Sequence, residues 1–230
     1  MFQKITELDD DFWGGVYAFS TDPMGRVISP EDKFILSRKA QDCGKAMAQK
    51  TAAEYETAKI RELVKRAGLT IEKTTGAEHG GTIHFAEFAE PDKIRIYESC
   101  LEKTPLGEEQ LSRDAKDLLA STEEVLITHE LFHYLEYQQR DTIFTRTYVH
   151  HLRPILFFHP TARLLCISEI AAMAFIKEYL KLPCSPYVFD LLLIYGFNKD
   201  KAYRLYNNII NLAGNVQAPV QKPIIDTISN

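Results

Sequence analysis

The chain has 230 residues, of which 45% are hydrophobic and 26% are charged, and this composition is typical of a folded globular protein. Such a length allows one sizeable core or two small lobes that share a cleft. The formal net charge of −5 argues against nucleic acid as a main partner. No stretch reaches the roughly 18–20 uncharged apolar residues of a membrane helix, so no membrane partner is expected.

The cysteines and the first residues bear on the cellular compartment. None of the four cysteines has a short metal-binding spacing such as Cys-x-x-Cys. They are Cys43, Cys100, Cys166 and Cys184. The beginning of the sequence is polar and soon acidic, at Asp9-Asp10-Asp11, and does not resemble a signal peptide. We therefore expect reduced thiols and a cytoplasmic protein.

The first third of the chain is predicted to be irregular and then helical. Turn signals dominate residues 1–30. Ser29 and Pro30 suit the cap and first position of a helix, and the composition stays helical to about Ala67. Gly44 is a possible interruption of this region, so the sequence leaves open one long helix or two.

Three runs that alternate apolar and polar residues follow, and they predict strands. The runs are 69–73, 82–88 and 93–98. We expect them to form a small, twisted sheet that is mostly antiparallel or mixed. His84 lies within the second run as a candidate metal ligand, although a histidine on a strand more often has a structural role.

The most informative segment is the helix predicted over 123–139. It contains no Gly or Pro and is apolar nearly all round, so we expect it to be buried. Ser121-Thr122-Glu123-Glu124 just before it resembles a capping box. His129-Glu130-Leu131-Phe132-His133 lies in its middle. Histidines four apart share one face of a helix, so the pair can bind a single metal ion.

Glu130 suggests that this metal site performs hydrolysis. The helical period rotates Glu130 by about 100° from His129, which disfavours it as a ligand with that pair. It is instead well placed to take a proton from a metal-activated water, while the metal polarises the carbonyl under attack. The alternative is a chance match or a structural role, in which case the buried polar groups need other partners.

A catalytic zinc site has three protein ligands and one open position. A third histidine six positions after His133 is excluded, because residue 139 is Gln139. Glu169 is our candidate, since it is an isolated charge in an apolar helix predicted over 161–180 and a metal would compensate its carboxylate.

Two alternatives to this third ligand stay open. Glu169 could instead form a buried salt bridge with Arg163 or Arg153. Glu136, seven residues after His129, could replace it as the ligand. A hydrogen bond from Glu136 to the second ring nitrogen of a ligand histidine suits its position better.

The combination of His129-Glu130-x-x-His133 with Glu169 resembles the gluzincin branch of the zincin metallopeptidases. The resemblance covers about residues 69–180 and is specific at those four residues. It implies an α+β, zincin-like fold in which a twisted sheet precedes the active-site helix and a later helix carries the glutamate. Members often have an acidic residue four positions after that glutamate, where this chain has Met173.

We predict one metallopeptidase-like domain over 1–230. Its first lobe, 1–140, would contain the long helical region, the sheet and the active-site helix. Its second lobe, 141–230, would be helical and carry the third ligand. It would include one or two helices over 186–214, broken at 196–198, and then an extended tail.

The expected function is that of a zinc-dependent peptidase acting on a peptide or protein substrate. Glu130 would be the general base and later the acid, and by resemblance the peptide would lie along the edge of the strand 93–99. Four residues are candidates for the donor that stabilises the oxyanion. They are Tyr148, His150, His151 and Tyr195.

Two other classes of protein compete with this reading. One is a zincin scaffold that binds metal for a regulatory purpose without peptidase activity. The other is a di-iron protein, which requires a second Glu-x-x-His that the sequence lacks. The sequence gives no indication of the oligomeric state.

Overall fold

The computed structural model describes residues 3–56, 59–75, 78–79, 82–105, 113–152, 156–157 and 159–215. Helices make up most of this part of the chain, which also contains a three-stranded sheet and two small two-stranded pairings. The predicted α+β class is therefore confirmed. None of the helices that the structure describes has the length and apolarity to cross a bilayer.

The N-terminal segment contains more helix than the turn signals predict. Short helical pieces follow one another there: α1 (Gln3–Thr6), α2 (Asp10–Phe12), a π-helix (Trp13–Ala18), α3 (Phe19–Thr21) and a 3-10 turn (Gly25–Val27). One reason for the difference is the packing of Gly14. A Cβ at this position would lie 2.2 Å from Ser37 Oγ on the long helix that follows, Pro30–Tyr55. The glycine thus permits close packing, where the sequence alone suggests a turn.

The long helical region is two helices, α4 (Pro30–Tyr55) and α5 (Ile60–Arg66). Ser29 Oγ accepts a hydrogen bond from the Asp32 N–H at 3.1 Å, which confirms the predicted start. The break follows Glu56, which has a left-handed φ of 48°. Gly44 lies inside α4 and does not interrupt it.

The sheet is mixed, which is one of the two arrangements that the sequence left open. Its order is β1 (Thr70–Thr74), β5 (Lys93–Tyr97) and β4 (Ala86–Ala89). β1 pairs with β5 in parallel, whereas β4 pairs with β5 antiparallel. β2 (Glu78–His79) and β3 (Thr82–Ile83) form a separate antiparallel pair. Because β5 is the central strand, the prediction that its edge binds a substrate is wrong. The edge strands are β1 and β4, and β4 is the one that contacts the helix of the His129–His133 motif.

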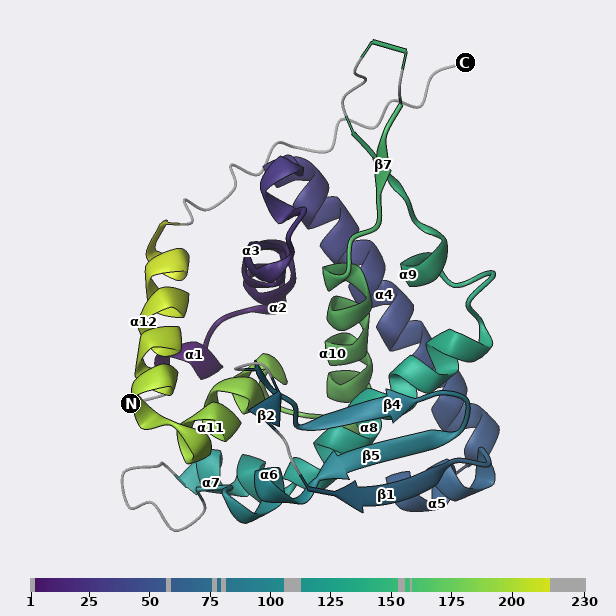
Figure 1. Cartoon of the computed structure of the whole chain (residues 1–230), viewed down its shortest axis with the longest axis vertical. Helices are drawn as coiled ribbons and strands as arrows, with labels where there is room; N and C mark the ends of the chain where they lie inside the picture. The colour runs from purple at the N-terminus through teal and green to yellow at the C-terminus, as the bar shows by residue number, and fades with distance from the viewer. Residues whose placement is uncertain are drawn as a thin grey trace.

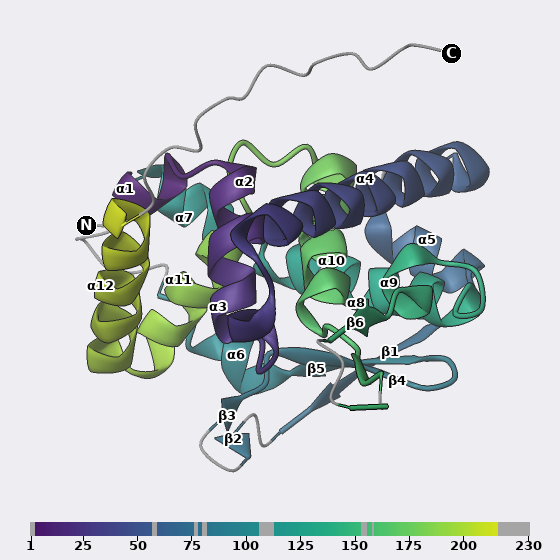
Figure 2. The ribbon, with the colours of Figure 1, turned by 90° about the horizontal axis from the view of Figure 1, so that it is seen from above.

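The motif helix is α8 (Thr122–Gln138), and it is preceded by the short helices α6 (Glu98–Glu102) and α7 (Arg113–Ala120). The predicted capping box does not form, because the Ser121 hydroxyl donates to the Leu118 carbonyl at 2.8 Å. One side of α8 contacts β4 and β5, and the other contacts α10 (Cys166–Leu180). Figures 1 and 2 show α8 and α10 between the sheet and the long α4.

The remaining elements follow α8. They are α9 (Phe144–Thr147), the hairpin of β6 (His150–His151) and β7 (Thr161–Ala162), then α10, α11 (Tyr187–Phe197) and α12 (Lys199–Asn215). The helix predicted from residue 161 begins later because Thr161 and Ala162 pair with β6. Asn198 separates α11 from α12, close to the predicted break. The predicted extended tail lies outside the described residues.

The core forms where α10 lies against α4 and α8. Ala171 and Ala172 are completely buried, and these small side chains allow the helices to approach closely. A Cβ at Gly44 of α4 would lie only 2.1 Å from the carbonyl oxygen of Ala171. This contact fixes the position of α10, and with it the position of Glu169 relative to α8.

Candidate metal centre

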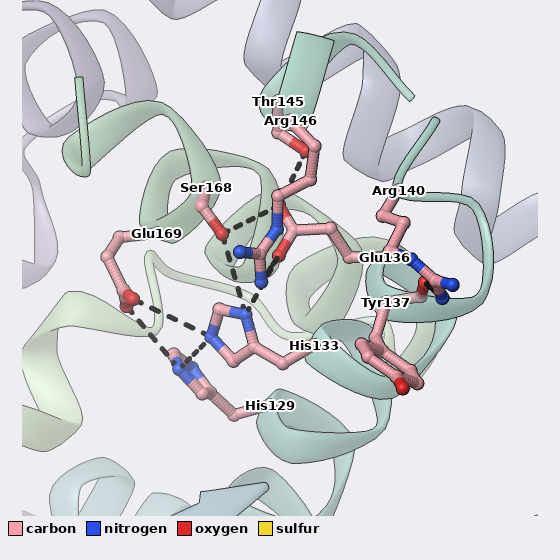
Figure 3. Close-up of polar contacts among 9 residues, drawn as sticks. All are labelled: His129, His133, Glu136, Tyr137, Arg140, Thr145, Arg146, Ser168 and Glu169. Carbon is pink, nitrogen blue, oxygen red and sulfur yellow. Dashed lines mark hydrogen bonds and ion pairs between the residues drawn. The ribbon is translucent and has the colours of Figure 1, made fainter. Parts of the chain in front are cut away.

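The two histidines of the motif lie in the middle of α8, one helical turn apart. Their rings therefore project from the same side of the helix, and Glu169 from the first turn of α10 extends toward them (Figure 3). The three side chains come from two helices that the core packs against each other. The packing of these two helices thus brings the possible ligand atoms of His129, His133 and Glu169 into one group.

The distances within this group are short. His129 Nε2 and His133 Nε2 are 3.0 Å apart. The Glu169 carboxylate lies 3.4 Å from His129 Nε2 and 3.6 Å from His133 Nε2. One ligand atom from each of these residues falls within 4.8 Å of the others, so the group could hold a metal ion. We call it the metal triad.

The alternatives for Glu169 find no support in the described residues. Arg163 is exposed and forms no ion pair with Glu169 among them, and Arg153 lies outside the described ranges. The Glu169 side chain is 48% exposed, so it reaches an open space and is not sealed in a buried salt bridge. Its partners are the two histidines.

When no metal is present, the Glu169 carboxylate and the two histidine rings attract each other electrostatically. Burial disfavours the protonated form of His129, but the hydrogen bond and charge of Glu169 outweigh it and raise the pKa of His129 to about 9. Burial likewise opposes ionisation of Glu169, yet the two histidines lower its pKa to about 2. Water in the cleft screens part of this attraction, because the carboxylate is half exposed.

Glu136 occupies the other side of His133. Its carboxylate is fully buried and lies 3.5 Å from His133 Nδ1, the ring nitrogen opposite Nε2. Ser168 and Thr145 donate to it at 2.8 and 2.5 Å, and Arg146 lies 2.8 Å away (Figure 3). This geometry supports the predicted contact with a histidine ring and not the alternative role as metal ligand.

The Glu136 contacts have a consequence for its ionisation. Burial alone would raise the pKa of this carboxyl, but the hydrogen bonds from His133, Thr145 and Ser168 lower it. Glu136 therefore stays ionised and can fix the orientation of the His133 ring. No pattern in the sequence singles out Thr145, Arg146 or Ser168, because ordinary polar residues acquire this role only when α9 and α10 pack beside α8.

A cleft of about 220 Å³ opens beside the triad. Its walls come from α8, α10, α11 and the segment joining β3 to β4, including Ala86 at the start of the edge strand. His84 lies on this wall, outside the triad. A substrate group in the cleft would thus lie between the triad and the edge strand.

Glu130 lines the same cleft. The residue is only 6% exposed, and its carboxylate interacts with the backbone of Phe88 in β4. Burial raises its pKa above the ordinary value, and the nearby charge of Glu169 adds to this effect. Glu130 is therefore outside the ligand group but lines the space beside it.

Asp190 on α11 is a titratable residue of the cleft that the sequence analysis missed. Burial raises its pKa to about 7, and the charge of Glu169 contributes. α11 is apolar nearly all round, so Asp190 is an isolated charge there as Glu169 is in α10. The same signal that singled out Glu169 could have found it.

The four predicted oxyanion donors do not line the cleft. Tyr148 and His150 lie 3.1 Å apart, hydroxyl to Nδ1, and His151 belongs to the β6–β7 hairpin. Tyr195 is buried and packs edge-on against Tyr203. None of the four is among the described residues around the cleft.

Comparisons with known proteins give no family assignment: no protein-family model, no curated protein and no solved structure matches this chain. We therefore infer the function from the fold and from the geometry of the triad and its cleft.

Proposed function

We propose that the protein is a zinc-dependent peptidase of the gluzincin kind. The observation that supports this most is the triad of His129, His133 and Glu169 beside a cleft that also contains Glu130. Two imidazoles and one carboxylate with a free position are a ligand set that zinc favours.

The spacing of the donor atoms agrees with this metal. Ligands at about 2.0–2.2 Å from a tetrahedral zinc ion lie about 3.3–3.6 Å from one another. The distances in the triad are 3.0, 3.4 and 3.6 Å. Small movements of the side chains would therefore be enough to bind the ion.

The chain's own residues would then act in sequence on a peptide bond. When bound, zinc would polarise the substrate carbonyl and lower the pKa of a water molecule. Glu130 accepts a proton from the attacking water as the water oxygen bonds to the carbonyl carbon. The same carboxyl then donates that proton to the amide nitrogen, and the C–N bond breaks. Its raised pKa suits the first step, because a higher pKa makes the carboxylate a stronger base toward the water.

The substrate and the compartment belong to the same proposal. A peptide in extended form would lie against the edge strand β4, whose Ala86 borders the cleft. All four cysteines are free thiols, which supports a reducing, cytoplasmic location.

The direct test is hydrolysis of a mixture of unstructured peptides by the zinc-loaded protein, followed by mass spectrometry. We expect new peptide termini with the loaded protein and none after a chelator removes the metal. If the fully loaded protein leaves every peptide intact, the peptidase proposal is wrong and a metal-binding or regulatory protein remains.

A further inference from the structure

The cleft combines apolar walls with one carboxylate that the proposed reaction does not use. Leu126, Ile176, Phe189 and Leu193 supply much of the apolar surface. Its acidic groups are Glu169 of the triad, the base Glu130, and Asp190. Asp190 has no part in metal binding or proton transfer as described above, so its presence in this space needs another explanation.

Among the described residues, no lysine or arginine forms an ion pair with Asp190. Its interactions with the described residues are Coulombic, an attraction to His129 and a repulsion from Glu169. His129 is already paired with Glu169 at 3.4 Å. The residues described around the cleft include no lysine or arginine. Tyr17 and Tyr187 also interact electrostatically with Asp190, and neither carries a positive charge.

The charge balance of a loaded cleft leaves Asp190 uncompensated. A divalent cation would offset the carboxylates of Glu169 and Glu130. The Asp190 carboxylate then lacks a counter-charge, and a poorly solvated carboxylate without one is unfavourable. A positive group that enters with the substrate would remove this penalty and would form a charge-assisted hydrogen bond.

We propose that Asp190 selects substrates that place a positively charged group, carried on an apolar stem, in the cleft beside the scissile bond. The inference rests on the proposed function only in treating this cleft as the substrate site. The apolar walls suit the stem, as they do for the aliphatic part of a lysine, while the charged end reaches Asp190. The positive group is either a lysine or arginine side chain or the α-amino group of the peptide.

Three small metal-directed probes separate these sources. They are the hydroxamates of N-acetyl-lysine, of N-acetyl-norleucine and of norleucine with a free amine. The first adds a side-chain charge to the second, and the third adds a terminal charge. Their dissociation constants would be measured by calorimetry on the zinc-loaded full chain, because binding does not depend on whether the protein hydrolyses peptides.

We expect at least one charged probe to bind about tenfold more tightly than N-acetyl-norleucine hydroxamate, as one charge-assisted hydrogen bond provides. In Asp190→Asn this preference should fall to within about twofold. Asp141→Asn, which removes an exposed carboxylate from the turn after α8 and changes the net charge equally, should keep it. Tighter binding of the lysine probe would identify a basic side chain as the positive group. Tighter binding of the free-amine probe would identify the α-amino group of the peptide.

Several outcomes would overturn the inference. One is equal affinity of the wild-type protein for all three probes, or no binding of any, and this result decides the matter even if Asp190→Asn does not fold. Another is an Asp190→Asn variant that keeps the preference. A third is a variant that loses zinc affinity but not the preference, which would make Asp190 a positioning residue for His129. Failure to hydrolyse peptides, by contrast, affects only the proposed function.

Discussion

Glu169 Oε2 lies 3.4 Å from His129 Nε2, and this single contact shifts the pKa values of the two residues in opposite directions. The pKa of His129 rises to about 9 and that of Glu169 falls to about 2, against the opposing effect of burial on each. Without metal, the pair is therefore an ion pair at neutral pH. A metal ion must displace the proton from His129 before its nitrogen can become a ligand.

The first prediction concerns this proton. At pH 8 the metal-free His129 is protonated because its pKa is about 9, whereas a ligand histidine is neutral. Zinc binding should release about one proton at pH 8, and the affinity should rise with pH up to about 9. Calorimetry in two buffers of different ionisation enthalpy measures the release. Zinc binding without proton release at pH 8 would show that the ion pair does not exist in solution.

The second prediction concerns the third ligand. Glu169→Ala should lower zinc affinity by more than the about 10- to 100-fold that is typical of residues outside the ligand set. Glu178→Ala is a matched control, because it removes a carboxylate from the same helix that pairs with Lys181 instead. Metal content after dialysis against a chelator series distinguishes them. Equal zinc retention by the two variants would exclude Glu169 as a ligand.

The third prediction separates metal binding from catalysis. Glu130→Gln preserves the shape of the side chain but removes its basicity, so zinc content should stay unchanged. Hydrolysis should fall by about 100- to 10,000-fold or more, the contribution of a general base. The measurement is kcat/KM on a cleaved peptide, together with metal analysis of the same sample. A variant with the parent rate would refute the mechanism.

The metal triad could be predicted from the sequence because it depends on features within single helices. Two histidines four residues apart on an uninterrupted helix must share a face, and a carboxylate within the apolar first half of α10 needs a partner. The start of α4 was predictable for the same reason, since the Ser29 cap acts within one turn.

Features that depend on long-range packing were not predictable in this way. Alternation identifies strands but not their order, so the central place of β5 emerges only when β1 joins it in parallel. The partners of Glu136 come from α9 and α10, which the chain folds beside α8. Gly44 suggested a helix break, yet its missing side chain serves the contact between α4 and α10.

The fourth prediction tests the contacts of the buried Glu136. Arg146→Met removes the guanidinium 2.8 Å from this carboxylate. Because Arg146 is 43% exposed and Thr145 and Ser168 still donate to Glu136, the loss of stability should be modest, about 1–2 kcal/mol. Urea unfolding measures it. Arg140→Met, on an exposed arginine in the turn after α8, should change stability by less than about 0.5 kcal/mol.

The same carboxylate should affect the metal through His133. Glu136→Gln weakens the acceptor near His133 Nδ1, so zinc affinity should fall by about tenfold or more while the ligand set stays intact. An unchanged affinity would mean that Glu136 only stabilises the fold.

The fifth prediction concerns the helix contact that positions the triad. A Cβ at residue 44 would lie 2.1 Å from the backbone oxygen of Ala171, which cannot move without shifting α10. Gly44→Ala should therefore cost about 1–3 kcal/mol of unfolding free energy, and it should weaken zinc binding because α10 carries Glu169.

Gly214→Ala on α12 is the matched control for Gly44→Ala, since a Cβ there meets no atom within 4 Å. It should be neutral or stabilising by up to about 1 kcal/mol, because alanine favours a helix over glycine, and zinc affinity should not change. Urea midpoints and zinc titrations of the two variants provide the comparison. If Gly44→Ala were as stable as the parent, α4 and α10 could not be in the close contact that places Glu169 opposite the histidines.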